Sequence, residues 1–461
     1  MGHKGAKGAT NAMTQMVRLG DVAHINPRFD KSSLADDVPV SFVQMASVGA
    51  ADGKINVSIV RPFSEVKKGS YTPFKDGDVL FAKVTPCMEN GKMAVARGLK
   101  NGVGFGSSEF HVLRPSDQVD AKYLYYFVSS QAFRKEAAGH MTGAVGLRRV
   151  PAAFLADAEL PLVPLDEQRR IVAEIEKQFS RLDEAVANLR RVKANLKRYK
   201  ASVLKAAVEG RLVETESSIA QREGRSFETG EQLLQRILDE RRAKGVGIGK
   251  YKEPAPLDTQ NLKNLPDGWT WATVEMVCDA IVDCPHSTAK FQTHGYPCVD
   301  TTWMTTEGLA QERARFVDEA TYNDRISRLA PKTGDIVFAR EGTIGTAVLI
   351  PDRMAPCLGQ RVMLLRTSSD YLNGLLVHVL HSEIVKVQYR SQALGSTVAH
   401  INVGDVKRFA VPVPPASEQA RIVAEVDRHL SIIREVEAEV DINLKRALAL
   451  RQAILSKQFS V

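Results

Sequence analysis

An internal repeat limits the folds that this chain can adopt. Residues 164–174 read Pro-Leu-Asp-Glu-Gln-Arg-Arg-Ile-Val-Ala-Glu, and residues 415–425 read Pro-Ala-Ser-Glu-Gln-Ala-Arg-Ile-Val-Ala-Glu. Eight of the eleven positions are identical, at an offset of 251 residues. Self-similarity at such a distance indicates two copies of one architecture in a single chain.

Each copy opens a long predicted helix. A proline precedes it, Asp166 or Ser417 can cap its first amides, and Glu167 or Glu418 lies at the positive end of its dipole. Apolar residues then recur every three or four positions, and neither Pro nor Gly interrupts the first copy before Gly210. Some 44 residues at about 1.5 Å each make a rod of about 66 Å. We expect the two helices to bury their apolar stripes on each other as an antiparallel coiled coil, because two separate core helices would be shorter.

A weaker repeat lies upstream of each helix. Residues 75–83 and 332–340 both contain a Gly-Asp turn followed by an apolar, strand-like run. Short helical patterns follow, so we predict an α+β fold with a pseudo-twofold repeat. The predicted segments are a flexible tail (1–15), a first globular domain (16–163), a long helix (164–213), a linker with a short helix around 230–243 (214–265), a second globular domain (266–413) and a second long helix (414–461). We interpret the linker as a tether.

Composition narrows the class of protein. The 461 residues carry 62 Lys+Arg against 54 Asp+Glu, a net charge of +8, which favours an acidic partner such as nucleic acid. Nine Lys and Arg fall between Arg181 and Arg211, where phosphate contact and a solvated helix face are both open readings. No apolar run approaches the roughly 18 residues of a membrane span. Five cysteines without framework spacing fit a reducing cytoplasm.

The sequence contains no convincing catalytic motif. Walker A, H-E-x-x-H and G-x-S-x-G patterns are absent. The D-x-K pattern at Asp120 and Lys122 resembles half of a nuclease carboxylate-lysine site, but a lone pattern of this kind is expected by chance. Asn26-Pro-Arg-Phe29 superficially resembles the motif with which amino-methyltransferases hold a flipped base, but Arg28 breaks it and a turn is the better interpretation. A group of thiols and imidazoles lacks the C-x-x-C spacing of a zinc site, so we expect buried thiols and turn histidines and leave its role open. Its members are Cys278, Cys284, His286, His294 and Cys298.

At this point the residues carry a resemblance. Two different globular regions, each followed by a P-x-x-E-Q-x-x-I-V helix, resemble the specificity subunit of type I restriction-modification systems. The supporting motifs are residues 164–179, residues 196–213, Lys-Tyr-Lys-Glu-Pro at 250–254 and Leu-Pro-Asp-Gly-Trp at 265–269. The resemblance covers nearly the whole chain from Met16.

The resemblance implies a non-catalytic DNA-binding subunit. Each globular region would be a target recognition domain that reads one half of a bipartite, asymmetric site in double-stranded DNA. The long helices would set the spacing and dock two methyltransferase subunits, which restriction subunits can join. S-adenosylmethionine would belong to the methyltransferase partner, and ATP and Mg would belong to the restriction partner. This chain would hold no cofactor or metal.

Base readout is expected from Arg, Lys, Asn, Gln or Ser on loops, and phosphate contact from Lys, Arg, Ser and Thr. The candidate DNA-binding residues are Lys83, Lys92, Ser107, Ser108 and Arg148 in the first domain, and Arg340, Thr343, Arg361, His400 and Asn402 in the second. Residues 283–288 (Asp-Cys-Pro-His-Ser-Thr) resemble a stretch of some recognition domains, and contact with DNA or packing of a turn are both open. Two other functions are alternatives. If the chain is a self-contained enzyme, the isolated chain should bind S-adenosylmethionine. If it is a coiled-coil scaffold, it should show no sequence-selective DNA binding.

Overall fold

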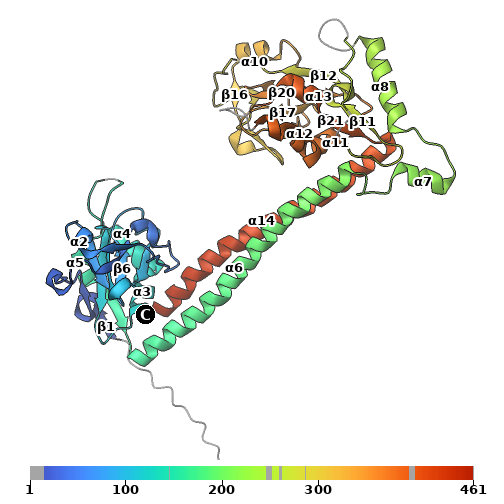
Figure 1. Ribbon diagram of the computed structural model, residues 1–461. Helices are drawn as coiled ribbons and strands as arrows, with labels where there is room; N and C mark the ends of the chain where they lie inside the picture. The colour runs from blue at the N-terminus through green and yellow to red at the C-terminus, as the bar shows by residue number, and fades with distance from the viewer. Residues whose placement is uncertain are drawn as a thin grey trace, which may run out of the picture. The chain divides into compact units, whose positions relative to one another are not determined.

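The computed structural model describes residues 15–144, 146–245, 252–258, 262–285, 287–393 and 400–459, so nearly all of the predicted tail lies outside the described residues. The chain divides into two compact units. Unit 1 comprises residues 1–190 and 440–461, and unit 2 comprises residues 191–439. Each unit therefore combines one of the predicted globular domains with a part of both long helices (Figure 1).

Unit 1 is built on two four-stranded sheets, of strand order β2-β9-β6-β7 and β4-β3-β8-β5, and a two-stranded ladder of β1 and β10. The strands are β1 (Gln15–Arg18), β2 (Ala23–Ile25), β3 (Pro39–Val43), β4 (Val60–Pro62), β5 (Thr72–Lys75), β6 (Val79–Ala82), β7 (Met93–Val95), β8 (Val103–Gly106), β9 (Phe110–Pro115) and β10 (Glu159–Leu162). The helices are α1 (Leu19–Val22), α2 (Phe63–Val66), α3 (Ala121–Ser129), α4 (Gln131–Gly139) and α5 (Ala152–Asp157), with 3-10 turns at Lys31–Ser33, Met45–Ser47 and Lys100–Gly102.

Unit 2 repeats this plan. Its main sheet has the order β12-β20-β17-β18, and β11 pairs with β21 as β1 pairs with β10. The strands are β11 (Thr270–Thr273), β12 (Cys278–Asp283), β13 (Tyr296–Val299), β14 (Met304–Thr305), β15 (Gly308–Leu309), β16 (Phe316–Val317), β17 (Ile336–Ala339), β18 (Ala347–Leu349), β19 (Cys357–Leu358), β20 (Val362–Thr367) and β21 (Ala410–Val413). The helices are α9 (Val274–Val277), α10 (Glu319–Ile326), α11 (Asn373–His381), α12 (Glu383–Ala393) and α13 (Val403–Arg408), with a 3-10 turn at Gln311–Arg313. The internal repeat and the α+β fold are thus confirmed.

The weaker repeat is also confirmed, because it places the same ion pair in both units. The aspartate of each Gly-Asp turn is buried at the start of β6 or β17. Asp78 accepts two hydrogen bonds of 2.8 Å from Arg114, and Asp335 accepts bonds of 2.8 and 2.7 Å from Arg366. A buried carboxylate needs such a bidentate partner to offset its loss of hydration.

The glutamine of the P-x-x-E-Q motif ties each long helix to its unit. The side-chain oxygen of Gln168 accepts from the Asp120 amide at 2.8 Å, and that of Gln419 accepts from the Leu372 amide at 2.8 Å. The amide group of Gln168 donates to the carbonyls of Gln118 and Val163, each at 2.8 Å. A fully buried amide side chain therefore fixes where the helix leaves the globular domain.

The two long helices are α6 (Leu165–Val208) and α14 (Ala416–Phe459), each of 44 residues. The first is shorter than predicted because Gly210, at a φ of +65°, ends it. Within unit 1, Arg451 of α14 donates a hydrogen bond to Asp183 of α6 at 2.7 Å. Within unit 2, the hydroxyl oxygen of Tyr199 on α6 lies 3.0 Å from Nδ1 of His429 on α14. The partner on α14 moves back along the chain as α6 advances, so the predicted antiparallel pairing is confirmed (Figure 1).

The predicted linker is more than a tether. It contains α7 (Glu216–Glu223), which was not predicted, and α8 (Gly230–Lys244), which matches the short helix that was. Leu233 and Ile237, one turn apart on α8, are buried in the core of unit 2. The interpretation as a tether is therefore wrong for the residues of α8, because they pack as part of unit 2.

Candidate nucleic-acid interface

The five candidate residues of the first domain gather around the end of β6. The Lys83 amide donates to the Glu109 carbonyl at 2.9 Å, which holds the loop of Ser107 and Ser108 beside it. The Val150 amide donates to the Lys83 carbonyl at 2.8 Å, which brings in the segment of Arg148. The Lys92 carbonyl accepts from the Ala82 amide at 3.1 Å. Residues far apart in the sequence are therefore neighbours.

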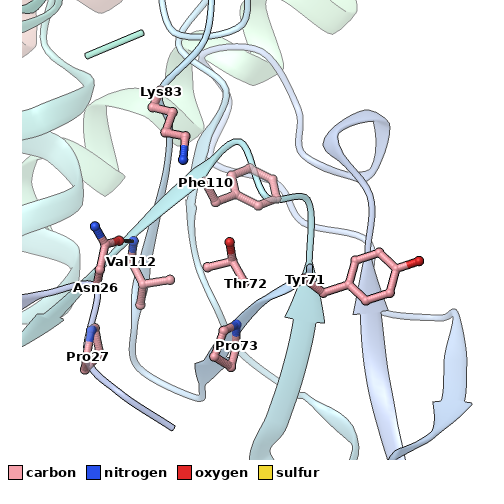
Figure 2. Close-up of a pocket in the computed structure, with 8 residues that line it drawn as sticks. All are labelled: Asn26, Pro27, Tyr71, Thr72, Pro73, Lys83, Phe110 and Val112. Atoms are coloured by element: carbon pink, nitrogen blue, oxygen red, sulfur yellow. Dashed lines mark hydrogen bonds between the residues drawn. The ribbon is translucent and has the colours of Figure 1, made fainter. Parts of the chain in front are cut away.

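A cleft of about 260 Å³ opens beside Lys83. Its lining combines aromatic, proline and polar side chains. These are Asn26, Pro27, Tyr71, Thr72, Pro73, Lys83, Phe110 and Val112. Figure 2 shows the Lys83 ammonium and the Thr72 hydroxyl pointing toward the same space. Among the residues that the structure describes, the Lys83 ammonium has no hydrogen bond or ion pair, so it is available to a ligand.

Asn26 is fixed at the wall of this cleft. Its side-chain oxygen accepts from the Val112 amide at 3.0 Å, and its amide nitrogen lies 2.9 Å from Nδ1 of His111. Burial lowers the pKa of His111, so this ring is neutral at physiological pH. The predicted turn at Asn26 is confirmed by a φ of +52°. Asn26, Tyr71 and Thr72 were not among the predicted DNA-binding residues, and of their features only the turn at Asn26 could be predicted from the sequence.

The other candidates of the first domain are partly engaged in the fold. The Lys92 ammonium donates to the Met45 carbonyl at 3.0 Å, and the Ser107 hydroxyl accepts from the Glu109 amide at 3.2 Å. Arg148 lies 3.8 Å from Glu89. Ser108 is exposed, whereas Lys83 is half-buried beside the cleft.

A charged pair stands next to the cleft. Arg149 donates two hydrogen bonds, of 2.9 and 2.8 Å, to the carboxylate of Glu109. These bonds hold the pKa of Glu109 below its usual range. Since Arg149 neutralises this carboxylate, Glu109 does not cancel the positive charge of Lys83.

The five candidate residues of the second domain gather at the equivalent end of β17. The Arg340 amide donates to the Arg361 carbonyl at 2.9 Å, and the Ile401 amide donates to the Arg340 carbonyl at 3.0 Å. The same two bonds surround Lys83 in unit 1. The backbone of Glu341 forms an antiparallel β-bridge with that of His400, which precedes Ile401 and Asn402. Thr343 lies exposed in the turn that leads from β17 to β18.

The Arg340 guanidinium is bonded within the described fold, unlike the Lys83 ammonium. It is 7% exposed, donates to Asp283 at 2.6 Å and donates to the Ile401 carbonyl at 3.1 Å. Contact of Arg340 with DNA stays a prediction, and within the fold its guanidinium is held by Asp283 and the Ile401 carbonyl. In the segment 283–288, Asp283 holds this arginine, and contact of the segment with DNA stays a prediction.

The remaining candidates of unit 2 lie at the surface. Arg361 is exposed at a φ of +69° and pairs with Glu341 at 3.4 Å. His400 and Asn402 are exposed, and Asn402 donates to Asp405 at 3.2 Å. Their contact with DNA stays a prediction, as it does for the residues of unit 1.

The described thiols and imidazoles do not assemble into a metal site. Cys278, Cys284 and Cys298 are buried, and burial raises the pKa of the Cys278 thiol. His294 is exposed beside Thr293, and His286 lies outside the described residues. No group of three His, Cys, Asp or Glu suited to a metal ion is found in the part of the chain that the structure describes.

The suspected half of a nuclease site has a structural explanation. Asp120 caps α3 by accepting hydrogen bonds from the amides of Lys122 and Tyr123. The Lys122 ammonium pairs with Glu176 of α6. Both side chains therefore hold elements of unit 1 together.

Among the described helices, none is long and apolar enough to span a membrane.

Comparison with known proteins adds independent evidence. The family model described as "Type I restriction modification DNA specificity domain" matches residues 12–198 and 300–445, more than half of the chain. The chain is 27% identical to the type I restriction enzyme EcoAI specificity subunit of Escherichia coli, over 89% of this chain and 76% of that protein. It is 24% identical to the EcoEI specificity subunit of Escherichia coli, over 95% of this chain and 81% of that protein.

A solved structure shares the fold. It concerns complex assembly and conformational transition of the type I restriction-modification system, and one of its chains superimposes with a TM-score of 0.67. The two chains are 23% identical, and the superposition covers 96% of this chain and 97% of the other.

Proposed function

Because the chain belongs to the family of type I restriction-modification DNA specificity proteins, we propose that it selects the DNA sequence on which its complex acts. Each globular domain reads one half of a bipartite, asymmetric site in double-stranded DNA. The chain performs no catalysis itself. It supplies specificity to partner subunits that carry the chemistry.

The observation that carries this proposal is the pair of equivalent residue clusters at the ends of β6 and β17. Both are framed by the same backbone hydrogen bonds, so the two units present their loops in the same way. The side chains differ, since among the described residues the Lys83 ammonium has no hydrogen bond or ion pair, whereas the Arg340 guanidinium is held by Asp283. Two like platforms with different side chains support recognition of two different half-sites.

The long helices support a role in spacing and docking. A helix of 44 residues spans about 66 Å at about 1.5 Å per residue, enough to separate two contact regions on DNA. The helix α14 exposes large apolar side chains, Ile432 and Val436 in unit 2 and Leu448 and Leu450 in unit 1. Apolar surface on a helix is suited to a protein partner. The repeat supports docking of two like methyltransferase subunits.

The cofactors belong to those partners. The methyltransferase subunits bind S-adenosylmethionine and flip the target base, and restriction subunits use ATP and Mg. The complex acts in the cytoplasm, and the free cysteines of the described chain suit a reducing compartment.

Selection from a random pool tests the proposal. The full chain, assembled with its methyltransferase partner, is incubated with random duplexes at rising salt, and the retained molecules are sequenced. Non-specific attraction to phosphates fades with salt, whereas base readout survives. We expect two different short blocks separated by a fixed unselected gap. A palindrome, a single block or no enrichment would contradict the proposal.

A further inference from the structure

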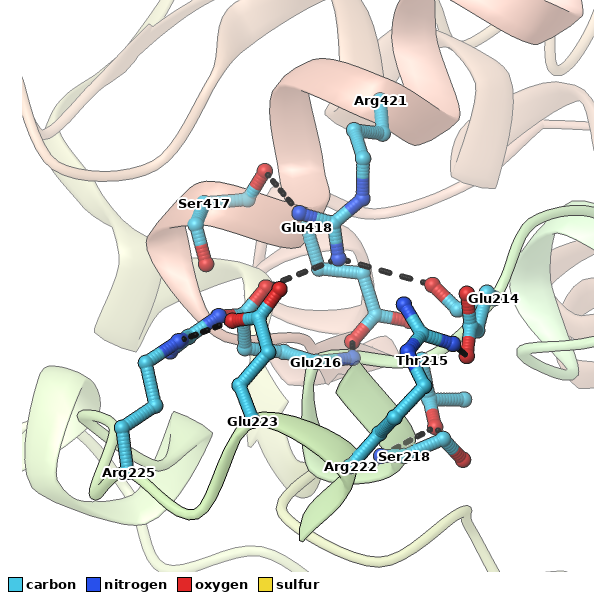
Figure 3. Close-up of polar contacts among 10 residues, drawn as sticks. All are labelled: Glu214, Thr215, Glu216, Ser218, Arg222, Glu223, Arg225, Ser417, Glu418 and Arg421. Carbon is cyan, nitrogen blue, oxygen red and sulfur yellow. Dashed lines mark hydrogen bonds and ion pairs between the residues drawn. The ribbon is translucent and has the colours of Figure 1, made fainter. Parts of the chain in front are cut away.

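The start of α14 holds another segment of its own unit. The carboxylate of Glu418 accepts a hydrogen bond of 2.9 Å from the backbone amide of Glu216, the first residue of α7. Arg421, one turn along α14, lies 2.8 Å from the carboxylate of the same Glu216. Glu418 and Arg421 thus bind both the amide and the side chain of one acidic residue at a helix start (Figure 3).

This contact is buried, and among the described residues Oε1 of Glu418 and Nε of Arg421 have no hydrogen-bond partner. Glu418 is fully buried, and the Glu216 side chain is 4% exposed. Burial alone would raise the pKa of Glu216, but Arg225 and Arg421 together lower it, so this carboxylate is charged. Arg225 donates to it at 2.7 Å from the other side. A buried carboxylate between two guanidiniums is a specific contact, because loss of one partner leaves the charge uncompensated.

The same pair of side chains stands at the start of α6, in unit 1. Glu167 and Arg170 occupy the positions of Glu418 and Arg421 in the repeated motif. The two helix starts share a backbone hydrogen bond, in which the backbone amide of Gln168 or Gln419 donates to the carbonyl of the preceding proline at 3.0 or 3.1 Å. In unit 1, however, Glu167 and Arg170 bond each other at 2.8 Å. Their side chains are 34% and 75% exposed.

We infer that Glu167 and Arg170 form a receptor for a helix start of the methyltransferase subunit that carries Asp or Glu at its first position. This inference rests on the proposed function. The repeat supplies the recognition chemistry: Glu167 accepts from the backbone amide of the acidic residue, and Arg170 pairs with its carboxylate. The receptor of unit 2 is already filled by α7, so the receptor of unit 1 serves only one of the two proposed methyltransferase subunits.

Charge selects a protein occupant over the alternatives. A phosphate would meet the carboxylate of Glu167, so DNA is disfavoured. Residues 1–14 of this chain contain no Asp or Glu and cannot repeat the contact that Glu216 makes. An acidic helix start suits the site also because its free amides find an acceptor in Glu167.

A pair of matched double variants tests the inference in the assembled complex. Glu167→Gln with Arg170→Gln removes the receptor. Asp166→Asn with Arg169→Gln removes the adjacent exposed ion pair of the same turn, whose atoms lie 3.2 Å apart. Titration of the methyltransferase onto each full chain should show at least a tenfold loss of affinity for the first variant and less than a twofold loss for the second. Equal affinities of the two variants would overturn the inference.

A photo-crosslinker at position 170 identifies the occupant. We expect the crosslinked peptide to come from the methyltransferase and to contain Asp or Glu at the start of a helix. Crosslinks to this chain alone, to a segment without an acidic residue, or to nothing would overturn the inference. The proposed function fails separately, if the wild-type chain neither assembles with the methyltransferase nor selects DNA.

Discussion

Lys83 and Arg340 occupy the same place in the two units, yet their side chains make different contacts. The Lys83 ammonium points into a cleft beside Thr72, whereas Arg340 is bound by Asp283 (Figure 2). The weak sequence repeat predicts that the two positions are equivalent. It does not predict the difference, because Asp283 lies 57 residues from Arg340 and meets it only in the folded domain.

The first prediction concerns Lys83. Replacement by Met keeps the aliphatic stem and removes the charge, so the complex should lose roughly 1–3 kcal/mol of discrimination between its target and random duplex. The measurement is the ratio of the two dissociation constants at one salt concentration. Lys68→Met, at an exposed position of the same unit, is the control and should leave the ratio unchanged. A ratio that is the same for both variants would count against Lys83 as a reading residue.

The second prediction concerns pH. Nε2 of His381 accepts from the Ala347 amide at 3.0 Å, and burial, assisted by electrostatic repulsion from His378, Lys386 and Lys200, lowers the pKa of His381 to about 3. In the native state His381 stays neutral, whereas in the unfolded state it is protonated below about pH 6.5. The contribution of neutral His381 to the free energy of unfolding is therefore complete above pH 6.5 and is lost as the pH falls toward 3.

Unfolding in urea at several pH values checks this. The free energy of unfolding of the wild type should fall by up to about 1.4 kcal/mol per pH unit more steeply than that of His381→Gln, which keeps an acceptor but does not titrate. Parallel pH dependence in the two proteins would show that His381 is not the responsible group.

At the scale of elements, local patterns predicted well and distant contacts did not. The two long helices follow from their three-and-four apolar spacing, and α8 from its apolar pair Leu233 and Ile237. The helix α7 was missed because its sequence, Glu-Ser-Ser-Ile-Ala-Gln-Arg-Glu, is mostly polar and its docking depends on Glu418, 202 residues from Glu216. The cleft beside Lys83 was missed for the same reason, since it joins residues of β5 and β9 with residues of the loops that hold Asn26, Tyr71 and Lys83.

The third prediction is that the buried glutamine fixes the long helix to its unit. Gln168→Leu leaves the Asp120 amide and two carbonyls without their partner, so unit 1 should lose roughly 1–3 kcal/mol of stability. Gln178→Leu removes only an exposed bond of 2.8 Å to Glu174 and serves as the control, with an expected loss below about 0.5 kcal/mol. Thermal unfolding measures both, and similar losses would contradict the anchoring role.

The fourth prediction is that α8 belongs to the fold of unit 2. Leu233 is fully buried, so Leu233→Ala should destabilise unit 2 by about 2–5 kcal/mol, as cavity-forming substitutions do. Glu231→Ala, at an exposed position of the same helix, should change stability little. Hydrogen exchange of the strand amides in β11 and β21 reports the effect. Unchanged exchange in the leucine variant would return α8 to the status of a tether.

At the scale of the whole molecule, the repeat makes two readers from one plan. Each unit carries its own core, its own main sheet and its own anchored helix start. The fifth prediction follows: a multiple substitution confined to the candidate residues of unit 2, Thr343, Arg361, His400 and Asn402, should degrade one half of the recognised sequence and leave the other half intact. Selection from a random pool measures this, and simultaneous loss of both halves would show that the readers are not independent.

The central claim is that this chain chooses where its complex methylates DNA. Single-molecule sequencing of methylated bases, in host DNA with and without the gene, tests it most directly. Without the gene, we expect the loss of one bipartite, asymmetric methylated motif and of no other. If no motif changes while the partner methyltransferase is expressed, the chain does not direct methylation and the account is contradicted.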